Sequence, residues 1–196
     1  MADGGSTDRT VFEARQGGAE VIVAPGGGRG GQVAAAVAQS TEEIVLVAHA
    51  DMVLPRSALE TVRKSLAELP DCPGGCLGHR FDDRSLALRV IERWDRWRAR
   101  LANSYGDQAQ FFRRELLQST GGFPNQPIME DIELSLRLRS LATPIYLDLP
   151  VTVSARRFVR KKWWRVVWQN LMLRWAYRRR GPAACAELYA RYYRGR

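Results

Sequence analysis

The fold of this chain is decided by one stretch, Glu43-Ile44-Val45-Leu46-Val47-Ala48-His49-Ala50-Asp51-Met52-Val53-Leu54-Pro55. Residues 44–48 are continuously apolar and rich in β-branched side chains, and the run is too short to span a membrane. It therefore predicts a strand buried on both faces of a parallel sheet. The polar side chains of His49 and Asp51 follow at the carboxyl end of that strand. Because ligands of open α/β sheets bind at this edge, both are candidates for a binding site.

Strands and helices on either side of this stretch complete an α/β pattern. Further strands are predicted at 19–24, 75–81 and 145–149. Helices are predicted at 10–15, 32–39, 57–69, 114–119 and 130–141. A longer amphipathic helix over 85–102 carries an apolar face made of Leu86, Val90, Ile91, Trp94 and Trp97. The alternation of strands and helices favours a mostly parallel sheet flanked by helices.

The composition places the chain among globular proteins. Its 196 residues suit one domain with an appendage, and 45% of them are hydrophobic. Residues 1–6 are polar and predict no signal peptide. Three cysteines, Cys72, Cys76 and Cys185, form no disulfide framework, and a zinc site on Cys72 and Cys76 would lack the usual four ligands. These features predict a protein of the reducing cytoplasm.

The positive charge is concentrated in a C-terminal tail, residues 155–196. This tail carries 13 Lys and Arg residues against the single acid Glu187, a net charge of +12, whereas the whole chain carries +9. The first 154 residues therefore carry −3. A tail of one sign favours a polyanionic partner, either a phospholipid surface or nucleic acid.

A helix predicted at 163–177 lies within this tail. One stripe of it is aromatic and apolar, and consists of Trp164, Val167, Trp168, Leu171, Met172 and Trp175. Another side carries Lys162, Asn170, Arg174 and Arg178. This combination is typical of a helix that lies in a membrane interface. A helix packed into the core, with a solvated basic face, fits the pattern equally well.

Two loops are candidates for binding phosphate. Residues 3–8, Asp-Gly-Gly-Ser-Thr-Asp, precede the helix at 10–15, which Ser6 or Thr7 would cap, and such a loop suits a nucleotide or serves as a plain surface turn. In the second loop, Gly26, Gly28 and Gly31 match the dinucleotide fingerprint. Because five of six positions there are glycine, a generic anion-binding or flexible loop is favoured over a nicotinamide-dependent oxidoreductase.

Glu130 and Asp131 open the helix at 130–141. Carboxylates in a first helical turn often only complement the helix dipole. Here the preceding loop is apolar and bounded by proline, so a general base that faces a cleft is the alternative.

Several motifs occur together in one order along the chain. They are Asp-Gly-Gly-Ser-Thr-Asp (3–8), Gly-Arg-Gly-Gly-Gln (28–32), His-Ala-Asp (49–51), Gly-Asp-Gln (106–108), Gly-Gly-Phe-Pro (121–124), Met-Glu-Asp-Ile-Glu-Leu (129–134) and Ser-Ala-Arg-Arg (154–157). In this order they resemble a family 2 glycosyltransferase, and most of all the small bacterial radical-SAM/selenodomain-associated transferases.

The resemblance implies a GT-A fold that moves a sugar, with inversion, from a nucleotide-diphosphate sugar to an acceptor hydroxyl. A Rossmann-like nucleotide half, about residues 1–70, would join an acceptor half, about 71–154, with the tail at 155–196. Asp131 would be the catalytic base, with Glu130 beside it. The donor would be bound by Asp3, Gly4, Ser6, Arg29, Gln32 and Asp51. The acceptor side would contain Gly106, Asp107, Gln108, Arg156 and Arg157.

A divalent cation, Mn²⁺ or Mg²⁺, is the cofactor that the resemblance implies. Asp51 would hold it against the donor's two phosphates, since Mg²⁺ typically uses only one or two carboxylates plus phosphates. His49 occupies the first acidic position of the usual motif, and Mn²⁺ tolerates imidazole better than Mg²⁺ does.

The chain departs from the family in two places. The family usually has a strand and a helix before the Asp-Gly-Gly-Ser segment, so we expect the natural protein to begin upstream of Met1. Ala34 also stands where relatives usually have asparagine. The leading expectation is a cytoplasmic transferase, peripheral at the inner face of the membrane, acting on a lipid-linked or glycolipid acceptor. The alternative is a catalytically impaired homologue whose tail binds membrane or, less expectedly, nucleic acid.

Overall fold

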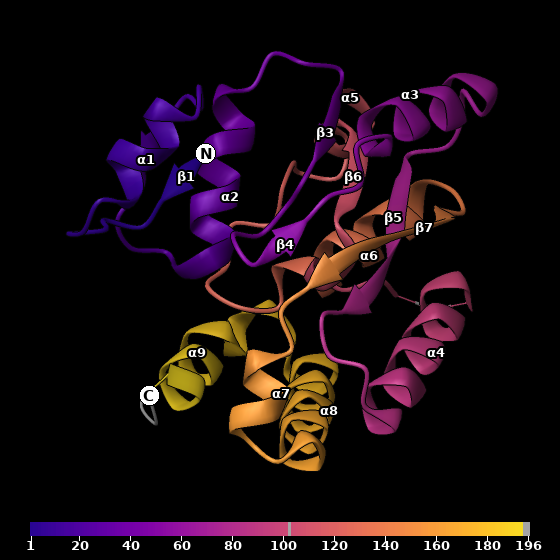
Figure 1. The fold of residues 1–196 in the computed structure, drawn as a ribbon. Helices are drawn as coiled ribbons and strands as arrows, with labels where there is room; N and C mark the ends of the chain where they lie inside the picture. Colours follow the sequence, from indigo (N-terminus) through magenta and orange to yellow (C-terminus); the bar gives the residue numbers. More distant parts are fainter. Residues whose placement is uncertain (102, 194–196) are drawn as a thin grey trace. The chain divides into compact units, whose positions relative to one another are not determined.

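The computed structural model describes residues 1–101 and 103–193 (Figure 1). Ala102, the end of the helix predicted at 85–102, lies outside the described residues, as do the tail's Arg194 and Arg196. The chain forms two compact units. The first comprises Met1–Thr41, Phe123–Glu130 and Leu173–Arg196, and the second comprises Glu42–Gly122 and Asp131–Met172.

The first unit contains a small parallel sheet and its helices. Strand β1 (Ala2–Asp3) pairs with β2 (Ile22–Val23), and α1 (Thr10–Gln16) connects them. Helix α2 (Gly28–Gln39) begins inside the glycine-rich loop, four residues before the predicted start, because Gly27 adopts a left-handed conformation at φ 67° and turns the chain into the helix. A 3₁₀ turn, η2 (Pro182–Ala184), leads into α9 (Cys185–Tyr193).

The second unit is built on a five-stranded sheet in the order β3-β6-β5-β7-β4. The strands are β3 (Ile44–Leu46), β4 (Met52–Val53), β5 (Gly74–Phe81), β6 (Gln110–Arg113) and β7 (Ile145–Val153). Only β5 and β7 pair in parallel, and the other three pairings are antiparallel. The α/β class is as predicted, but the prediction of a mostly parallel sheet is wrong for these five strands.

The remaining helical segments belong wholly or partly to the second unit. They are α3 (Ala58–Glu68), α4 (Leu86–Leu101), η1 (Gly106–Gln108), α5 (Arg114–Gln118), α6 (Glu130–Leu141), α7 (Arg156–Arg160) and α8 (Trp163–Arg180). Helix α8 continues into the first unit from Leu173. Within the described residues, no helix combines the length and the hydropathy that a bilayer crossing demands.

The strand buried on both faces is β5, not the strand at 44–48. Only Arg80 of β5 is exposed, whereas Ile44–Leu46 is half-buried at the edge of the five-stranded sheet. The sequence did not indicate that β5 is the buried strand, because the glycines of β5 weaken its apolar pattern. They are needed there because a Cβ at Gly74 would come within 2.7 Å of Phe112 Cα, so only glycine lets β6 approach.

Helix α4 turns its apolar face outward, against the usual expectation for an amphipathic helix. Leu86, Val90, Trp94 and Trp97 are exposed, and only Ile91 of that face packs against the core. The buried side chains of α4 are Leu88, Asp95, Arg98 and Ala99. Arg98 donates to Asp95 Oδ1 from two nitrogens, at 3.1 and 2.9 Å, so this polar side is buried as a satisfied ion pair.

Candidate donor and catalytic sites

The N-terminal loop of the first unit is organised by Asp3 at the end of β1. The buried Asp3 carboxylate accepts hydrogen bonds from the Ser6 hydroxyl at 2.6 Å and from the amides of Ser6 and Gly5, each at 2.8 Å. The Ser6 hydroxyl, and then the two amides, lower the pKa of Asp3 below its usual value. The prediction that Ser6 or Thr7 caps α1 is wrong, because Arg9 occupies that position without a side-chain cap.

Helix α2 meets this loop through Gln32. A Cβ added at Gly4 would come within 3.2 Å of Gln32 Cδ, so the absence of a side chain at Gly4 lets the amide of Gln32 lie against the loop. Asp3, Gly4, Ser6 and Gln32, predicted to contact the donor, therefore lie together. Their polar groups are acceptors and donors of the kind that a nucleoside requires.

The glycine-rich loop is used for packing. Arg29, predicted to bind the donor, forms an ion pair with the carboxylate of Glu130, which is only 2% exposed. A Cβ at Gly28 would come within 2.7 Å of Pro127 Cα, and one at Gly30 within 2.8 Å of Glu130 Cβ. These close approaches to residues 126–130 explain Gly28 and Gly30 without a dinucleotide, whereas Gly26 is suited by its left-handed backbone at φ 87°.

In the second unit, the side chains of Asp131 and His49 both lie next to Gly106. The amide of Gly106 donates to Asp131 Oδ2 at 2.8 Å, and Asp131 Oδ1 accepts from the amide of Ile132 at 2.8 Å. A Cβ at Gly106 would lie 2.5 Å from His49 Nε2 and 3.4 Å from Asp131 Oδ2. The predicted base and the predicted metal-side histidine are therefore neighbours, which their separation in the sequence did not indicate.

Asp51 lies on the exposed loop between β3 and β4. Its carbonyl oxygen accepts from the amide of Ser154 at 3.2 Å, which fixes the loop to the end of β7. One exposed carboxylate is a poor preformed metal site, but it fits an ion that a donor diphosphate supplies with most of its ligands. The side chain of His49, the second residue predicted to hold the metal, lies against Gly106.

Residues predicted on the acceptor side have different surroundings. Gln108 is fully buried, and its Oε1 accepts from the amide of Tyr105 at 3.0 Å, so it shapes η1 from within. Arg156 is exposed. Arg157 donates to Gln169 Oε1 and Asn170 Oδ1, both at 3.5 Å. Asp107 turns inward to a group that the sequence did not reveal.

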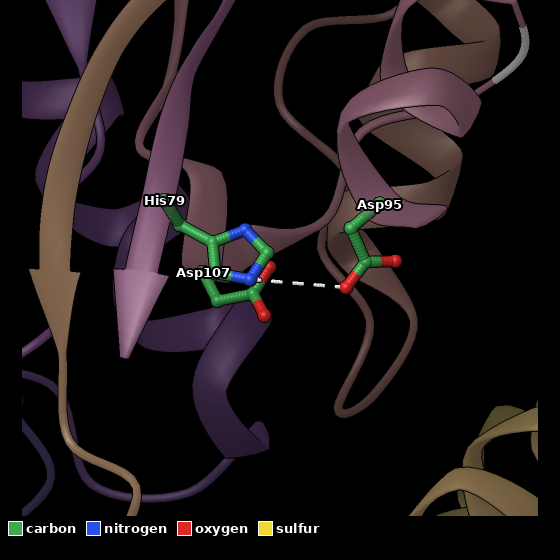
Figure 2. A group of neighbouring side chains, drawn as sticks. All are labelled: His79, Asp95 and Asp107. Atoms are coloured by element: carbon green, nitrogen blue, oxygen red, sulfur yellow. Dashed lines mark ion pairs between the residues drawn. The ribbon is translucent and has the colours of Figure 1, made fainter. Parts of the chain in front are cut away.

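That group consists of His79 from β5, Asp95 from α4 and Asp107 from η1 (Figure 2). One ligand atom of each lies within 4.8 Å of the other two, and His79 Nε2 is 3.8 Å from Asp95 Oδ2. Burial raises the pKa of Asp107, with Asp95 and Asp131 acting in the same direction against His79 and Arg98. The only hint in the sequence was a histidine within the predicted strand at 75–81.

Solved structures share this fold. The mannosyltransferase PcManGT from Pyrobaculum calidifontis, in complex with GDP-Man and Mn²⁺, has a TM-score of 0.62 and 23% identity over 76% of this chain and 45% of its own. TarS residues 1–349 from S. aureus, in complex with UDP-GlcNAc, has a TM-score of 0.57 and 18% identity over 78% of this chain and 48% of its own. No curated protein sequence matches this chain.

The chain spans about half the length of these solved chains. At such identities the likeness shows the fold, and it confirms the predicted GT-A class. The sequence model "Glycosyl transferase family 2" matches residues 1–121, more than half of the chain. This match agrees with the order of motifs from Asp3 to Gly121, and the chain therefore belongs to glycosyl transferase family 2.

Proposed function

We propose that the protein transfers a sugar from a nucleotide-diphosphate sugar to an acceptor hydroxyl, with inversion at the anomeric carbon. The observation that carries this proposal is the half-buried Asp131 carboxylate, oriented by the amides of Gly106 and Ile132. Each carboxylate oxygen accepts one of these bonds, so the carboxylate is oriented before the acceptor binds. Asp131 would take the proton of the acceptor hydroxyl while the oxygen of that hydroxyl attacks the anomeric carbon and the nucleoside diphosphate leaves.

The first unit would bind the nucleotide. Hydrogen bonds from Ser6 hold the Asp3 carboxylate ionised and oriented before any ligand arrives. Asp3 can therefore accept hydrogen bonds from the base or the ribose with little loss of conformational entropy. Gln32 and Ser6 line the same loop. Glu130 was also predicted to be catalytic, but its buried ion pair with Arg29 favours a positioning role. We retain the division into a nucleotide half at about 1–70 and an acceptor half at about 71–154.

A divalent cation held by Asp51, with His49 as a second group, would neutralise the charge of the leaving diphosphate. The similarity to a structure that contains Mn²⁺ supports this cofactor, and the imidazole favours Mn²⁺ over Mg²⁺.

A membrane surface is the proposed place of the reaction. The aromatic stripe of α8 is exposed, with Trp164 at 50%, Trp168 at 61% and Trp175 at 56%, so the interfacial interpretation is favoured over a core-packed helix. Lys and Arg side chains of the tail would meet anionic headgroups. A lipid-linked or glycolipid acceptor would then lie within reach of the enzyme.

Thermal stabilisation by UDP, GDP and dTDP, each with and without Mn²⁺, tests the donor half of this proposal. The nucleotide that stabilises the chain identifies the donor class, and Asp51→Ala should lose the Mn²⁺-dependent part of the shift. Release of that nucleotide from its sugar then measures turnover. Asp131→Asn should bind the donor as the wild type does and turn over at least about 1,000-fold more slowly. Wild-type turnover in this variant would refute Asp131 as the base.

The second candidate is a binding protein without transferase activity, which the exposed stripe of α8 and the tail's net charge of +12 favour. Binding to anionic vesicles and to single-stranded oligonucleotides over a salt series separates its two forms. Nucleic-acid binding falls steeply with salt, whereas insertion of aromatic side chains into lipid persists. A chain that melts cooperatively and is stabilised by no nucleotide would support this candidate.

A further inference from the structure

Three elements of the second unit bring one histidine and two aspartates together. His79 lies on β5, Asp95 on α4 and Asp107 on η1, and we call these three residues the His79 cluster. Their ligand atoms lie within 4.8 Å of one another, and Figure 2 shows the Asp107 carboxylate against the imidazole ring of His79, with the Asp95 carboxylate facing that ring across the dashed line. Tetrahedral coordination at about 2.0–2.2 Å places ligand atoms about 3.5 Å apart, so only a small contraction would bring all three onto one ion.

Two of these groups are buried with part of their hydrogen-bonding capacity unused. The His79 side chain is 1% exposed, and its Nε2 makes no hydrogen bond within the described residues. The same holds for Asp107 Oδ1, which is inaccessible to solvent. Both atoms belong to the cluster. A buried polar atom without a partner is unfavourable, and a ligand that fills the space between the atoms would remove this cost.

The charge around the cluster favours a cation. Asp95 and Asp107 contribute two carboxylates, while Arg98 contributes one positive charge and binds Asp95 Oδ1. The guanidinium of Arg98 also donates to the carbonyl oxygen of Asn103, which fixes its position beside Asp95 Oδ1. The other oxygen of Asp95, Oδ2, faces His79 Nε2. With a neutral imidazole and both carboxylates ionised, as metal binding requires, the cluster and Arg98 have a net charge of −1.

The ligand set selects the kind of ion. One imidazole nitrogen with two carboxylate oxygens suits Zn²⁺ or Mn²⁺, whereas Mg²⁺ prefers oxygen ligands alone. Three protein ligands from three elements would also hold those elements together, since the ion would connect β5, α4 and η1.

We propose that His79, Asp95 and Asp107 bind one Zn²⁺ or Mn²⁺ ion, and that they do so without nucleotide. The site uses neither Asp51 nor His49. Its effect on the proposed transfer would be positioning: Asp107 directly follows Gly106, whose amide orients Asp131, so an ion on Asp107 would keep η1 and that amide in place. Binding of the ion does not depend on the proposed function.

Histidine NMR tests the proposal directly, because the chain contains only two histidines. The full chain, labelled with ¹⁵N at its histidine rings and stripped with a chelator, is titrated with Zn²⁺ in the absence of nucleotide, and His49→Gln assigns the two sets of signals. We expect the His79 ring nitrogens to shift and saturate at one equivalent, while His49 stays unchanged. Unchanged His79 signals, or a shift of the His49 signals alone, would overturn the proposal.

Calorimetric titration of variants with Zn²⁺ and with Mn²⁺ provides the second measurement. Asp107→Asn and His79→Gln keep the side-chain size, and each should weaken binding by at least about 100-fold, since even changes outside the ligand sphere cost about 10- to 100-fold. Asp51→Ala is the matched control and should bind within about 2-fold of the wild type. If Asp51→Ala abolishes binding while Asp107→Asn preserves it, the ion belongs to the donor site and the proposal fails.

Discussion

Gly106 donates its amide to Asp131 Oδ2 at 2.8 Å, and the space that a side chain at Gly106 would fill is taken by His49. One backbone position thus sets both the orientation of the proposed base and the room for the imidazole beside it. The relation makes Gly106, rather than the acidic residues alone, the point at which the catalytic geometry can be tested.

Gly106→Ala should impair catalysis far more than folding. A Cβ there would lie 2.5 Å from His49 Nε2 and must displace the imidazole or η1. A displacement of about 1 Å at a reacting group costs up to about 100-fold in rate, so we expect kcat to fall about 10- to 100-fold, while nucleotide binding measured without metal stays unchanged. Gly17→Ala is the control, because Gly17 has φ −75° and its nearest neighbour would be 3.4 Å away. Equal kcat in the two variants would contradict the role of Gly106.

Ser6→Ala should weaken nucleotide binding. The Ser6 hydroxyl is the main cause of the lowered pKa of Asp3, so its removal should raise that pKa toward the ordinary value. The loss of one orienting hydrogen bond predicts about 2- to 10-fold weaker binding of the nucleotide that stabilises the wild type. Calorimetry measures the affinity, and carbonyl NMR of Asp3 measures the pKa. Thr7→Ala serves as the control, and it should leave both quantities as they are in the wild type.

Asp107→Asn should raise the melting temperature of the metal-free protein at neutral and alkaline pH. Burial raises the pKa of Asp107, so the folded state binds its proton more tightly than the unfolded state does, and stability is lost as pH rises above the unfolded value of about 3.9. The groups facing it are His79, Asp95, Arg98 and Asp131. The Asp107→Asn variant does not lose this stability, because asparagine does not ionise.

The difference between Asp107→Asn and the wild type should therefore shrink as pH falls toward 4. At neutral pH, Zn²⁺ should reverse the sign of this difference in melting temperature, because it stabilises only the wild type. Calorimetric melts over pH 4–9, with and without Zn²⁺, measure both effects. A difference independent of pH would show that Asp107 carries no buried charge in the folded protein.

Replacing Trp168 and Trp175 together by serine should release the protein from membranes. Both side chains are exposed on α8. Because the double variant loses the free energy of burying two indoles in the interface, we expect at least about 10-fold weaker partitioning into anionic vesicles. Trp94→Ser with Trp97→Ser is the matched pair on α4, since these side chains are about equally exposed. If the α4 pair reduces partitioning and the α8 pair does not, α8 is not the membrane-binding helix.

Local patterns predicted most elements but not their partners. The apolar run at 44–48 and the periodic segment at 130–141 predicted β3 and α6, because each pattern is contiguous in the sequence. The central strand β5 was underestimated, since its glycines serve the approach of neighbouring strands and add nothing to an apolar pattern. The sequence could not show which strands pair in parallel, because pairing depends on the whole sheet.

The same limit explains the candidate site. Asp3 and Asp131 were recognised because each belongs to a contiguous motif. The His79 cluster was missed because its members lie at positions 79, 95 and 107 and meet only after β5, α4 and η1 have packed. The face of α4 was misjudged for a related reason: the buried ion pair of Asp95 with Arg98 replaces the apolar contact that amphipathicity implies.

The outward stripe of α4 also governs how the protein behaves at high concentration. Leu86 is 85% exposed and Val90 66%, and with Trp94 and Trp97 they form a ridge that water solvates poorly. Two molecules can hide such ridges against each other, so turbidity and apparent mass should grow with concentration. A mild detergent that coats the ridge should keep the sample monodisperse, while the net charge of +9 alone would not.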